Sequence, residues 1–150
     1  MEQGADVQPH EPLDPFIGEW TMEVGFAEGL AGSLQFEWMP GERFVVQRWE
    51  VPVPEAPDGL AVIGFDEGRA RYLQHYFDSR GVARVYEMSF DGRVWKLWRM
   101  TPDFSPLDFW QRYEGTFSDD GDVIAGRWEI SHDEGSSWDV DFDITYRRVG

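Results

Sequence analysis

Apolar and polar residues alternate along most of the chain with the two-residue period of a β-strand that buries one face. The pattern starts at residues 20–26, where every even position is apolar. Before it, Pro12 and Pro15 hold the chain extended, because a proline ring fixes φ and disfavours helix at the preceding residue. No apolar period of 3.6 residues continues for three turns. The sequence therefore predicts little helix beyond single short turns near residues 16–17 and 30–32.

Turn residues bound ten segments of ordinary strand length, and these segments predict an all-β domain. Short loops between consecutive strands favour an antiparallel meander, and closing the meander into a barrel removes its unpaired edges. No repeat or linker indicates a second domain, so residues 15–150 are expected to form one barrel behind a flexible tail of residues 1–14. The ten segments are 19–27, 32–39, 43–52, 60–66, 70–78, 82–90, 93–100, 109–118, 122–131 and 138–148.

Two tight turns, Asp91-Gly92 and Asp120-Gly121, fit the two-residue loop of a β-hairpin, because both of their positions tolerate positive φ. Each loop predicts opposite charges paired on one face of its hairpin and apolar or aromatic residues paired on the other. The predicted pairs are Glu87–Lys96 and Met88–Trp95 in the first hairpin, and Glu114–Arg127, Arg112–Glu129 and Tyr113–Trp128 in the second.

Residues 131–138 resemble the Asp-box, Ser-x-Asp-x-Gly-x-Thr-Trp, with Ser137 in the place of threonine. Sialidases carry this box repeatedly on propeller blades. Here it occurs once, so it indicates a stiff hairpin turn rather than a propeller or a catalytic group. Pairing Trp128 with Val140 across this turn would set Arg127 opposite Asp141.

Gly18-x-Trp20 opens the first predicted strand, and Arg148 ends the last strand on its inner face. This combination resembles the lipocalins and their calycin relatives, in which an arginine of the final strand stacks over the first-strand tryptophan and closes one barrel end. Residues 64–81 and the segment from residue 115 onward further resemble an uncharacterised family of bacterial lipocalin-like barrels. The resemblance implies a ligand-binding barrel over roughly residues 15–149.

The chain of 150 residues has a formal net charge of −16, with 12 arginines and one lysine. A field of that sign repels phosphate backbones and anionic membrane surfaces, so neither a nucleic acid nor a membrane is expected as a partner. The sequence has no cysteine, which excludes disulfides and thiolate metal sites. It shows no membrane span and no signal peptide, so a cytoplasmic protein is expected. Whether exposed edges pair two chains into a homodimer stays open.

The same alternation places charged side chains inside the predicted barrel. Arg84 and Arg99 would point inward and lie opposite each other, and a short loop at residues 78–81 would add His75 opposite Arg84. Adjacent like charges are unfavourable unless something neutralises them, and bidentate contacts with a carboxylate ligand would do so. The alternative is that both arginines reach water at an open rim or pair with lumen acids such as Glu50.

Aromatic and amide side chains share the predicted lumen. Tyr86, Tyr113 and Trp128 are expected to line it, and Gln111 would offer a hydrogen bond. The sequence therefore predicts a barrel that binds a small, mainly apolar ligand, with an anionic group as one option, and that needs no cofactor. The predicted ligand contacts are His75, Arg84, Tyr86, Arg99, Tyr113 and Trp128, and the barrel-closing pair is Trp20 with Arg148.

Two other functions stay open. Nitrobindin-like proteins are ten-stranded barrels that hold haem iron through a histidine, and His75 is the histidine that falls within a predicted strand, so it would be the axial ligand. The second alternative is a small-molecule lyase or isomerase, in which Tyr86 beside Arg84 would act as a general acid. No nucleophile triad, phosphate loop or metal cluster marks a reaction. The acidic run 119–122 lacks the bidentate glutamate of a calcium loop and indicates a hairpin turn.

Overall fold

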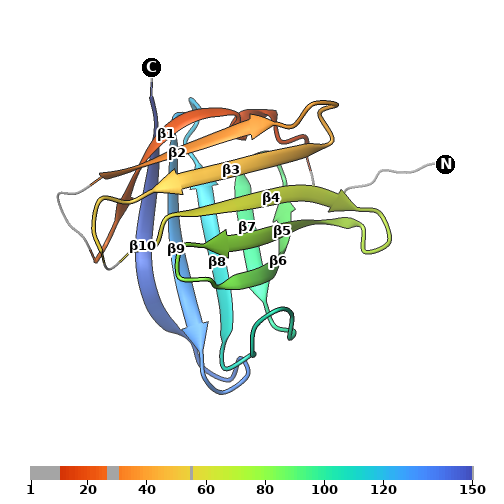
Figure 1. Ribbon diagram of the computed structural model, residues 1–150, viewed down its shortest axis with the longest axis vertical. Coiled ribbons are helices and arrows are strands. Elements are labelled where there is room, and N and C mark those ends of the chain that lie inside the picture. Colours follow the sequence, from red (N-terminus) through yellow and green to blue (C-terminus); the bar gives the residue numbers. More distant parts are fainter. Residues whose placement is uncertain (1–10, 27–30, 55, 150) are drawn as a thin grey trace.

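The structure, a computed structural model, describes residues 11–26, 31–54 and 56–149. All ten predicted strands are present and form one antiparallel meander that closes into a barrel (Figure 1). Within these residues the only helical element is the 3-10 helix η2 (Asp14–Phe16), whereas residues 31–32 belong to a strand and not to a helical turn. The strands are β1 (Gly18–Val24), β2 (Ala31–Trp38), β3 (Phe44–Glu50), β4 (Gly59–Asp66), β5 (Arg71–Asp78), β6 (Ala83–Phe90), β7 (Val94–Arg99), β8 (Trp110–Phe117), β9 (Val123–Ser131) and β10 (Asp139–Arg148).

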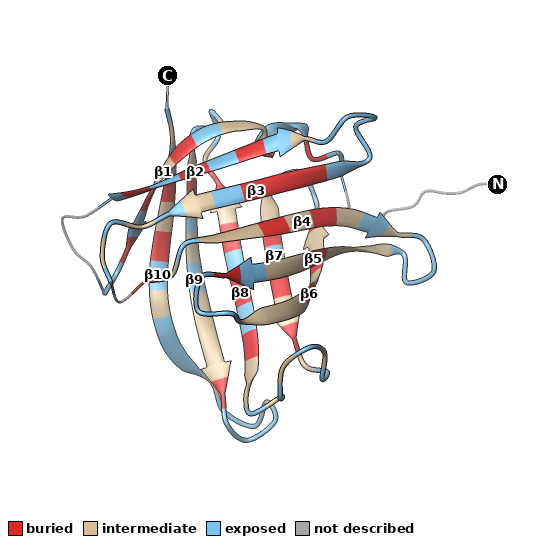
Figure 2. Cartoon of the chain, in the orientation of Figure 1, coloured by how far each residue is buried: buried red, intermediate tan, exposed pale blue. Residues whose placement is uncertain are grey.

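Strands that follow one another in sequence are neighbours in the sheet, and β1 pairs with β10 to close it. In Figure 1, strands β3–β5 run across strands β8–β10. The hydrophobic core contains residues from both walls, such as Val45 of β3 and Ile124 of β9. Figure 2 shows buried positions alternating with exposed ones along the strands, as in Trp20, Met22 and Val24 of β1. The predicted all-β barrel with one inward face is confirmed.

A plug of aromatic side chains fills one end of the barrel. Phe16 has no exposed surface and packs edge-on against Phe90, Trp95 and Phe117, with ring centroids 4.8, 5.0 and 5.1 Å away. The indole N–H of Trp20 donates to the carbonyl oxygen of Phe16 (2.9 Å). The turn before β1 is thereby fixed inside the barrel end.

Part of the predicted tail belongs to this plug. The Glu11 N–H donates to the Phe90 carbonyl (2.7 Å), and Leu13 is only 3% exposed. Residues 11–14 are therefore packed against the barrel rather than loose, and residues 1–10 lie outside the described residues. No helix in the described ranges has the length and hydropathy of a membrane span.

Arg148 lies over the Trp20 ring, as the sequence predicts, with its Cζ 4.2 Å from the ring centroid. Its guanidinium donates to the carbonyls of Ile17 (2.8 Å) and Pro15 (2.6 Å). Its Nε also lies 3.3 Å from the Asp122 carboxylate. One side chain thus joins the last strand, the first strand and the plug.

The turn after β9 is held by side-chain hydrogen bonds. The Ser131 hydroxyl accepts the Gly135 N–H (2.8 Å), and the Asp133 carboxylate accepts the N–H (2.8 Å) and hydroxyl (2.6 Å) of Ser137. These bonds, led by the Ser137 hydroxyl, lower the pKa of Asp133 to about 2. The stiff Asp-box hairpin is confirmed.

The β8–β9 register is also confirmed, with the pairs Glu114–Arg127, Arg112–Glu129 and Tyr113–Trp128.

The β6–β7 pairing is shifted by two residues from the prediction. The Asp91 carboxylate accepts backbone N–H groups of Arg93 (2.9 Å) and Val94 (2.6 Å), which centres the turn one residue later than Asp91-Gly92. Because side chains alternate with a period of two, this shift leaves the inner face unchanged. The observed pairs are Glu87–Trp98 and Met88–Leu97, instead of Glu87–Lys96 and Met88–Trp95.

The β9–β10 pairing also differs from the prediction. Next to the turn it is shifted by one residue, so that Val140 pairs with Glu129, and the β-bulge between Val140 and Phe142 adds a second residue. Trp128 faces Phe142 rather than Val140, whose side chain is exposed. The outer ladder therefore runs Glu114–Arg127–Asp143 instead of ending at Asp141, and the Arg127 Nε donates to Asp143 (2.7 Å).

The β5–β6 hairpin shifts by one residue, and this does change the faces. Asp78 accepts backbone N–H groups of the loop, which takes up one residue more than expected. Tyr76, not His75, pairs with Arg84. An odd shift exchanges the two faces of a strand. Gln74 and Tyr76 therefore point inward, and the predicted inward position of His75 is wrong.

Arg148→Met removes the stacking on Trp20 and the hydrogen bonds to the plug together. We expect the free energy of unfolding to fall by about 2–3 kcal/mol, because hydrogen bonds from a charged group and a cation–π contact are both lost. Arg147→Met is the matched control, since Arg147 is exposed and lies 3.6 Å from the exposed Glu23; its cost should stay below about 0.5 kcal/mol. Urea unfolding followed by tryptophan fluorescence measures both variants, and equal losses would contradict the closing role of Arg148.

Candidate functional site: the barrel cavity

The barrel encloses a cavity of about 380 Å³ that extends to the end opposite the plug. Its deeper wall includes inward residues of the strands, such as Leu34. Its mouth is bordered by residues of the loops between strands, namely Val51, Pro57, Arg80 and Phe109, and by the exposed Asp141 at the bulge in β10. The plugged end and this mouth give the cavity one direction of entry.

Six aromatic side chains form a continuous wall along the cavity. Consecutive ring centroids lie 5.4, 5.8, 5.4, 5.2 and 4.8 Å apart. Most of these contacts are tilted or edge-to-face, which is the favoured geometry of aromatic pairs. In order from the mouth the rings are Trp49, Tyr76, Tyr86, Trp128, Tyr113 and Trp95, so the structure places Tyr86, Tyr113 and Trp128 in the lining as predicted.

Tyr113 packs deep in this wall over two glycines. Gly115 and Gly126 pair with each other across β8 and β9, and a Cβ atom at either position would collide with the Tyr113 hydroxyl. Burial raises the pKa of Tyr113 well above its ordinary value. Within the described ranges, neither this hydroxyl nor the Trp95 indole N–H has a hydrogen-bond partner.

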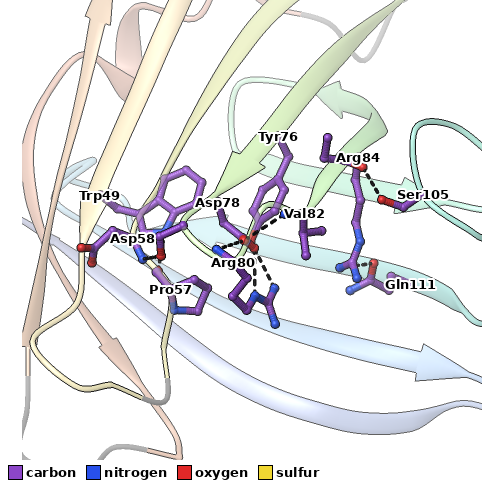
Figure 3. A network of polar contacts seen from close by, with 12 residues as sticks. Trp49, Pro57, Asp58, Tyr76, Asp78, Arg80, Val82, Arg84, Ser105 and Gln111 are labelled. Atoms are coloured by element: carbon purple, nitrogen blue, oxygen red, sulfur yellow. Dashed lines mark hydrogen bonds and ion pairs between the residues drawn. The ribbon is translucent and has the colours of Figure 1, made fainter.

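Arg84 is the arginine of the cavity lining that forms no ion pair with a carboxylate of the described residues. Its Nη1 donates to the Gln111 side-chain oxygen (3.4 Å), and its guanidinium lies 5.6 Å from the Phe109 ring centroid. The same oxygen accepts the Tyr86 hydroxyl (3.0 Å). Figure 3 shows the Arg84 guanidinium next to the Gln111 side chain. The remaining N–H groups of both side chains form a cluster of donors on the cavity wall.

Arg99 is neutralised by the protein itself. Its side chain is 1% exposed, and its Nε and Nη2 donate to the two oxygens of Asp103, both at 2.8 Å. It also donates to the carbonyls of Ser105 (3.1 Å) and Pro106 (3.2 Å). Arg99 lies on the inner face, as predicted, since it is buried and alternates in step with the lining residues Trp95 and Leu97. Its predicted position opposite Arg84 is wrong because the β6–β7 register is shifted by two residues, and its side chain is not part of the cavity lining.

Asp103 holds the loop after β7 against β6. Its carboxylate accepts the backbone N–H of Val85 (2.7 Å) and of Ser105 (3.0 Å) in addition to Arg99. Burial alone would raise the pKa of Asp103, but the hydrogen bonds from Arg99 and from the backbone outweigh it and lower the pKa to about 2. The carboxylate therefore stays ionised throughout the neutral range.

A second buried carboxylate organises the mouth. Asp78 accepts the Tyr76 hydroxyl (2.6 Å) and Nη2 of Arg80 (2.7 Å), as Figure 3 shows. Burial would raise the pKa of Asp78, but these partners and the backbone of Arg80 lower it to about 2. Burial and then the neighbouring carboxylate raise the pKa of Tyr76. Arg80 is thus paired, which leaves Arg84 as the lining arginine without a carboxylate.

His75 and Glu50 both lie outside the cavity. His75 lies on the outer face of β5, between the inward Gln74 and Tyr76. Glu50 is exposed because it alternates with the inward Trp49. His132 lies in the turn after β9, and His10 is outside the described residues. Neither described histidine is therefore placed to ligate haem iron in the cavity. In the described part of the chain, no group of three or more His, Cys, Asp or Glu residues could hold a metal ion.

Several residues of the site were not singled out from the sequence, and three of them illustrate why. Gln47 lies between the inward Val45 and Trp49 of β3, so the alternation already indicated its position. Gln74 becomes inward only with the one-residue shift of the β5–β6 hairpin. Asp103 lies in a loop without periodicity, where no sequence pattern indicates a partner for Arg99.

Asp103→Asn should destabilise the protein most at neutral pH. The pKa of Asp103 is about 2 in the folded protein and near 3.8 in the unfolded chain. Its ionised form therefore contributes about 2 kcal/mol above pH 4, and this contribution is lost as the pH falls from about 4 to about 2. Denaturation at a series of pH values should show the gap from wild type shrinking toward pH 2. The exposed Asp139→Asn is the control, and a gap that stays constant with pH would contradict the assignment.

No protein-family model matches the chain, and a search of curated proteins returns no match. The structure shows a closed ten-stranded antiparallel meander, which is compatible with a calycin-like fold. The cavity is consequently the feature from which a function is inferred.

Proposed function

We propose that this chain binds a small, mainly apolar molecule in the barrel cavity and orients it through an anionic or hydrogen-bond-accepting group at Arg84. One observation carries the proposal: Arg84 lines an aromatic cavity with no carboxylate partner in the described ranges, whereas Arg80 and Arg99 are each ion-paired. A partly buried charge is costly when unpaired, so an anionic ligand would stabilise the site as it binds.

The apolar body of the ligand would supply most of the affinity. A cavity of about 380 Å³ is in the size range of small-molecule sites. Removing about 200 Å² of apolar ligand surface from water contributes about 5 kcal/mol before the cost of association. A hydrogen bond to a charged group adds about 1.5–3 kcal/mol and has a direction. The aromatic wall therefore accounts for retention, and Arg84 accounts for orientation.

Binding is supported better than catalysis. The resemblance to bacterial lipocalin-like barrels supports a carrier, as does the Arg148–Trp20 closure, which leaves the opposite end as the entrance. Burial raises the pKa of Tyr86, and its hydroxyl donates to Gln111. At neutral pH Tyr86 therefore keeps its proton and acts as a hydrogen-bond donor, which gives little support to a proton-transfer role.

The test compares 8-anilinonaphthalene-1-sulfonate with N-phenyl-1-naphthylamine, which has the same rings without the sulfonate. Both probes fluoresce more strongly in an apolar site, so titration of the purified protein gives both dissociation constants. We expect Arg84→Met to weaken binding of the sulfonate about tenfold, equivalent to about 1.4 kcal/mol, and to change binding of the neutral probe less than about twofold.

Arg112→Met is the control, because Arg112 points outward from β8 and pairs with Glu129 (2.7 Å). It should leave both dissociation constants unchanged. Equal weakening of the two probes by Arg84→Met would remove the charge role. If neither probe binds the wild-type protein and native mass spectrometry of the purified protein shows no retained molecule, the binding function is overturned.

A further inference from the structure

Two glutamines meet inside the cavity, over the inner face of β4. Gln47 of β3 and Gln74 of β5 are 5% and 4% exposed, and both line the cavity. Nε2 of Gln74 donates to Oε1 of Gln47 (2.8 Å). Because β4 separates the two strands, their backbones lie about 10 Å apart, and the side chains reach toward each other across it. Ala61 of β4, which pairs with Gln47, is small and leaves room beneath the two amides.

A single hydrogen bond leaves this glutamine pair incompletely satisfied. Each amide has two N–H donors and a carbonyl oxygen that accepts. No partner within the described residues engages Nε2 of Gln47 or Oε1 of Gln74. Exchanging oxygen and nitrogen in both amides reverses the bond but again leaves one amide nitrogen and one carbonyl oxygen without a partner. The pair thus offers a donor next to an acceptor in either orientation.

The neighbouring hydroxyls of the same wall do not hydrogen-bond to the glutamine amides. The Tyr76 hydroxyl donates to Asp78 (2.6 Å), and the Tyr86 hydroxyl donates to Gln111 (3.0 Å). Tyr86 is the direct cross-strand neighbour of Gln74, so it is the hydroxyl best placed to serve that amide. Burying polar groups without partners is unfavourable, and a ligand with the matching group would offset that cost.

We infer that Gln47 and Gln74 form a subsite for a carboxamide group of the ligand. One glutamine donates to the ligand carbonyl oxygen, and the other accepts the ligand N–H. A lactam edge, which carries the same N–H and C=O side by side, fits the same description. The single-residue shift that turns Gln74 inward also turns His75 outward, so the wall that would have held a titratable group holds a neutral amide instead.

This inference rests on the proposed function and narrows it. Arg84 lies two residues from Tyr86, which pairs with Gln74, so Arg84 and Gln74 are diagonal neighbours on one wall. Residues in such positions are about 7–8 Å apart, and their Cβ atoms are somewhat closer. One small molecule can therefore reach both. The ligand class is an aromatic or otherwise apolar molecule that carries an anionic group at one end and a carboxamide or lactam at the other.

Four compounds test the subsite by isothermal titration calorimetry: (4-carbamoylphenyl)acetate, 3-(4-carbamoylphenyl)propanoate and the 4-acetyl counterpart of each. Each pair differs only by an amide NH₂ in place of a methyl group, so the acetyl compound keeps the shape and the carbonyl but has no donor. An amide is costlier to desolvate than a ketone, and a cavity without matching groups would favour the acetyl compound. We expect the wild-type protein to bind at least one carbamoyl compound about tenfold more tightly than its acetyl counterpart.

Gln47→Met/Gln74→Met is the matched variant. Methionine has a similar length, and replacing both amides leaves neither of them buried alone. The preference should reverse toward the acetyl compounds, while the affinity for 8-anilinonaphthalene-1-sulfonate stays within about threefold, because that probe is oriented by Arg84.

The outcomes separate the two proposals. The subsite is overturned if the wild-type protein binds the paired compounds equally or prefers the acetyl ones, or if the double variant keeps the carbamoyl preference. It is also overturned if the sulfonate probe binds and none of the four compounds does. If neither the four compounds nor the two naphthalene probes bind and native mass spectrometry shows no retained molecule, the proposed function itself fails. The wild-type comparison decides the matter even if the double variant does not fold.

Discussion

Pairing of β1 with β10 is the contact on which the enclosed space depends. It joins the two ends of the meander, and it sets Trp20 opposite Arg148 at the plugged end. A closed sheet has no free edge, so each strand has only an inner and an outer face. Since Phe16 fills one end, the apolar inner faces that remain can meet a ligand only from the other end. The position of the cavity is thus a consequence of how the barrel closes.

The fold could be predicted from the sequence because alternation and turn residues act locally. What could not be predicted is how many residues each turn takes up, since this depends on which backbone N–H groups an aspartate side chain binds. Asp91 moves its turn so that the register changes by two, and the faces survive. Asp78 lengthens its loop by one, and the faces of β5 exchange. A register error of two residues changes which residues pair but leaves each side chain on its predicted face. An error of one residue moves side chains from the lumen to the surface and from the surface to the lumen.

The candidate site also has a part that the sequence could predict and a part that it could not. Its aromatic lining was predictable, because Tyr86, Tyr113 and Trp128 follow the period of their strands. Which of its inward arginines are ion-paired could not be predicted. Whether an inward arginine is available to a ligand depends on carboxylates in loops, and Asp103 comes from a loop with no periodic pattern. Two inward arginines were expected either to bind an external anion or to reach water or acids of the protein itself. The protein neutralises one of them itself and leaves the other to the cavity.

The net charge and the cavity act over different distances. At −16 the chain as a whole repels an anion, but physiological salt screens exposed charges beyond about 8 Å. Near the mouth, Asp78 with Arg80 and Asp103 with Arg99 are pairs without net charge, so Arg84 is the cation left in the lining, with the exposed Asp141 as a carboxylate at the mouth. For a ligand of the proposed kind, long-range attraction would therefore contribute little, and burial of apolar surface would have to hold it. Under the proposed function, selection among apolar molecules would then depend on contacts within hydrogen-bond reach, where Arg84 and the two glutamines would each bind a group of matching chemistry.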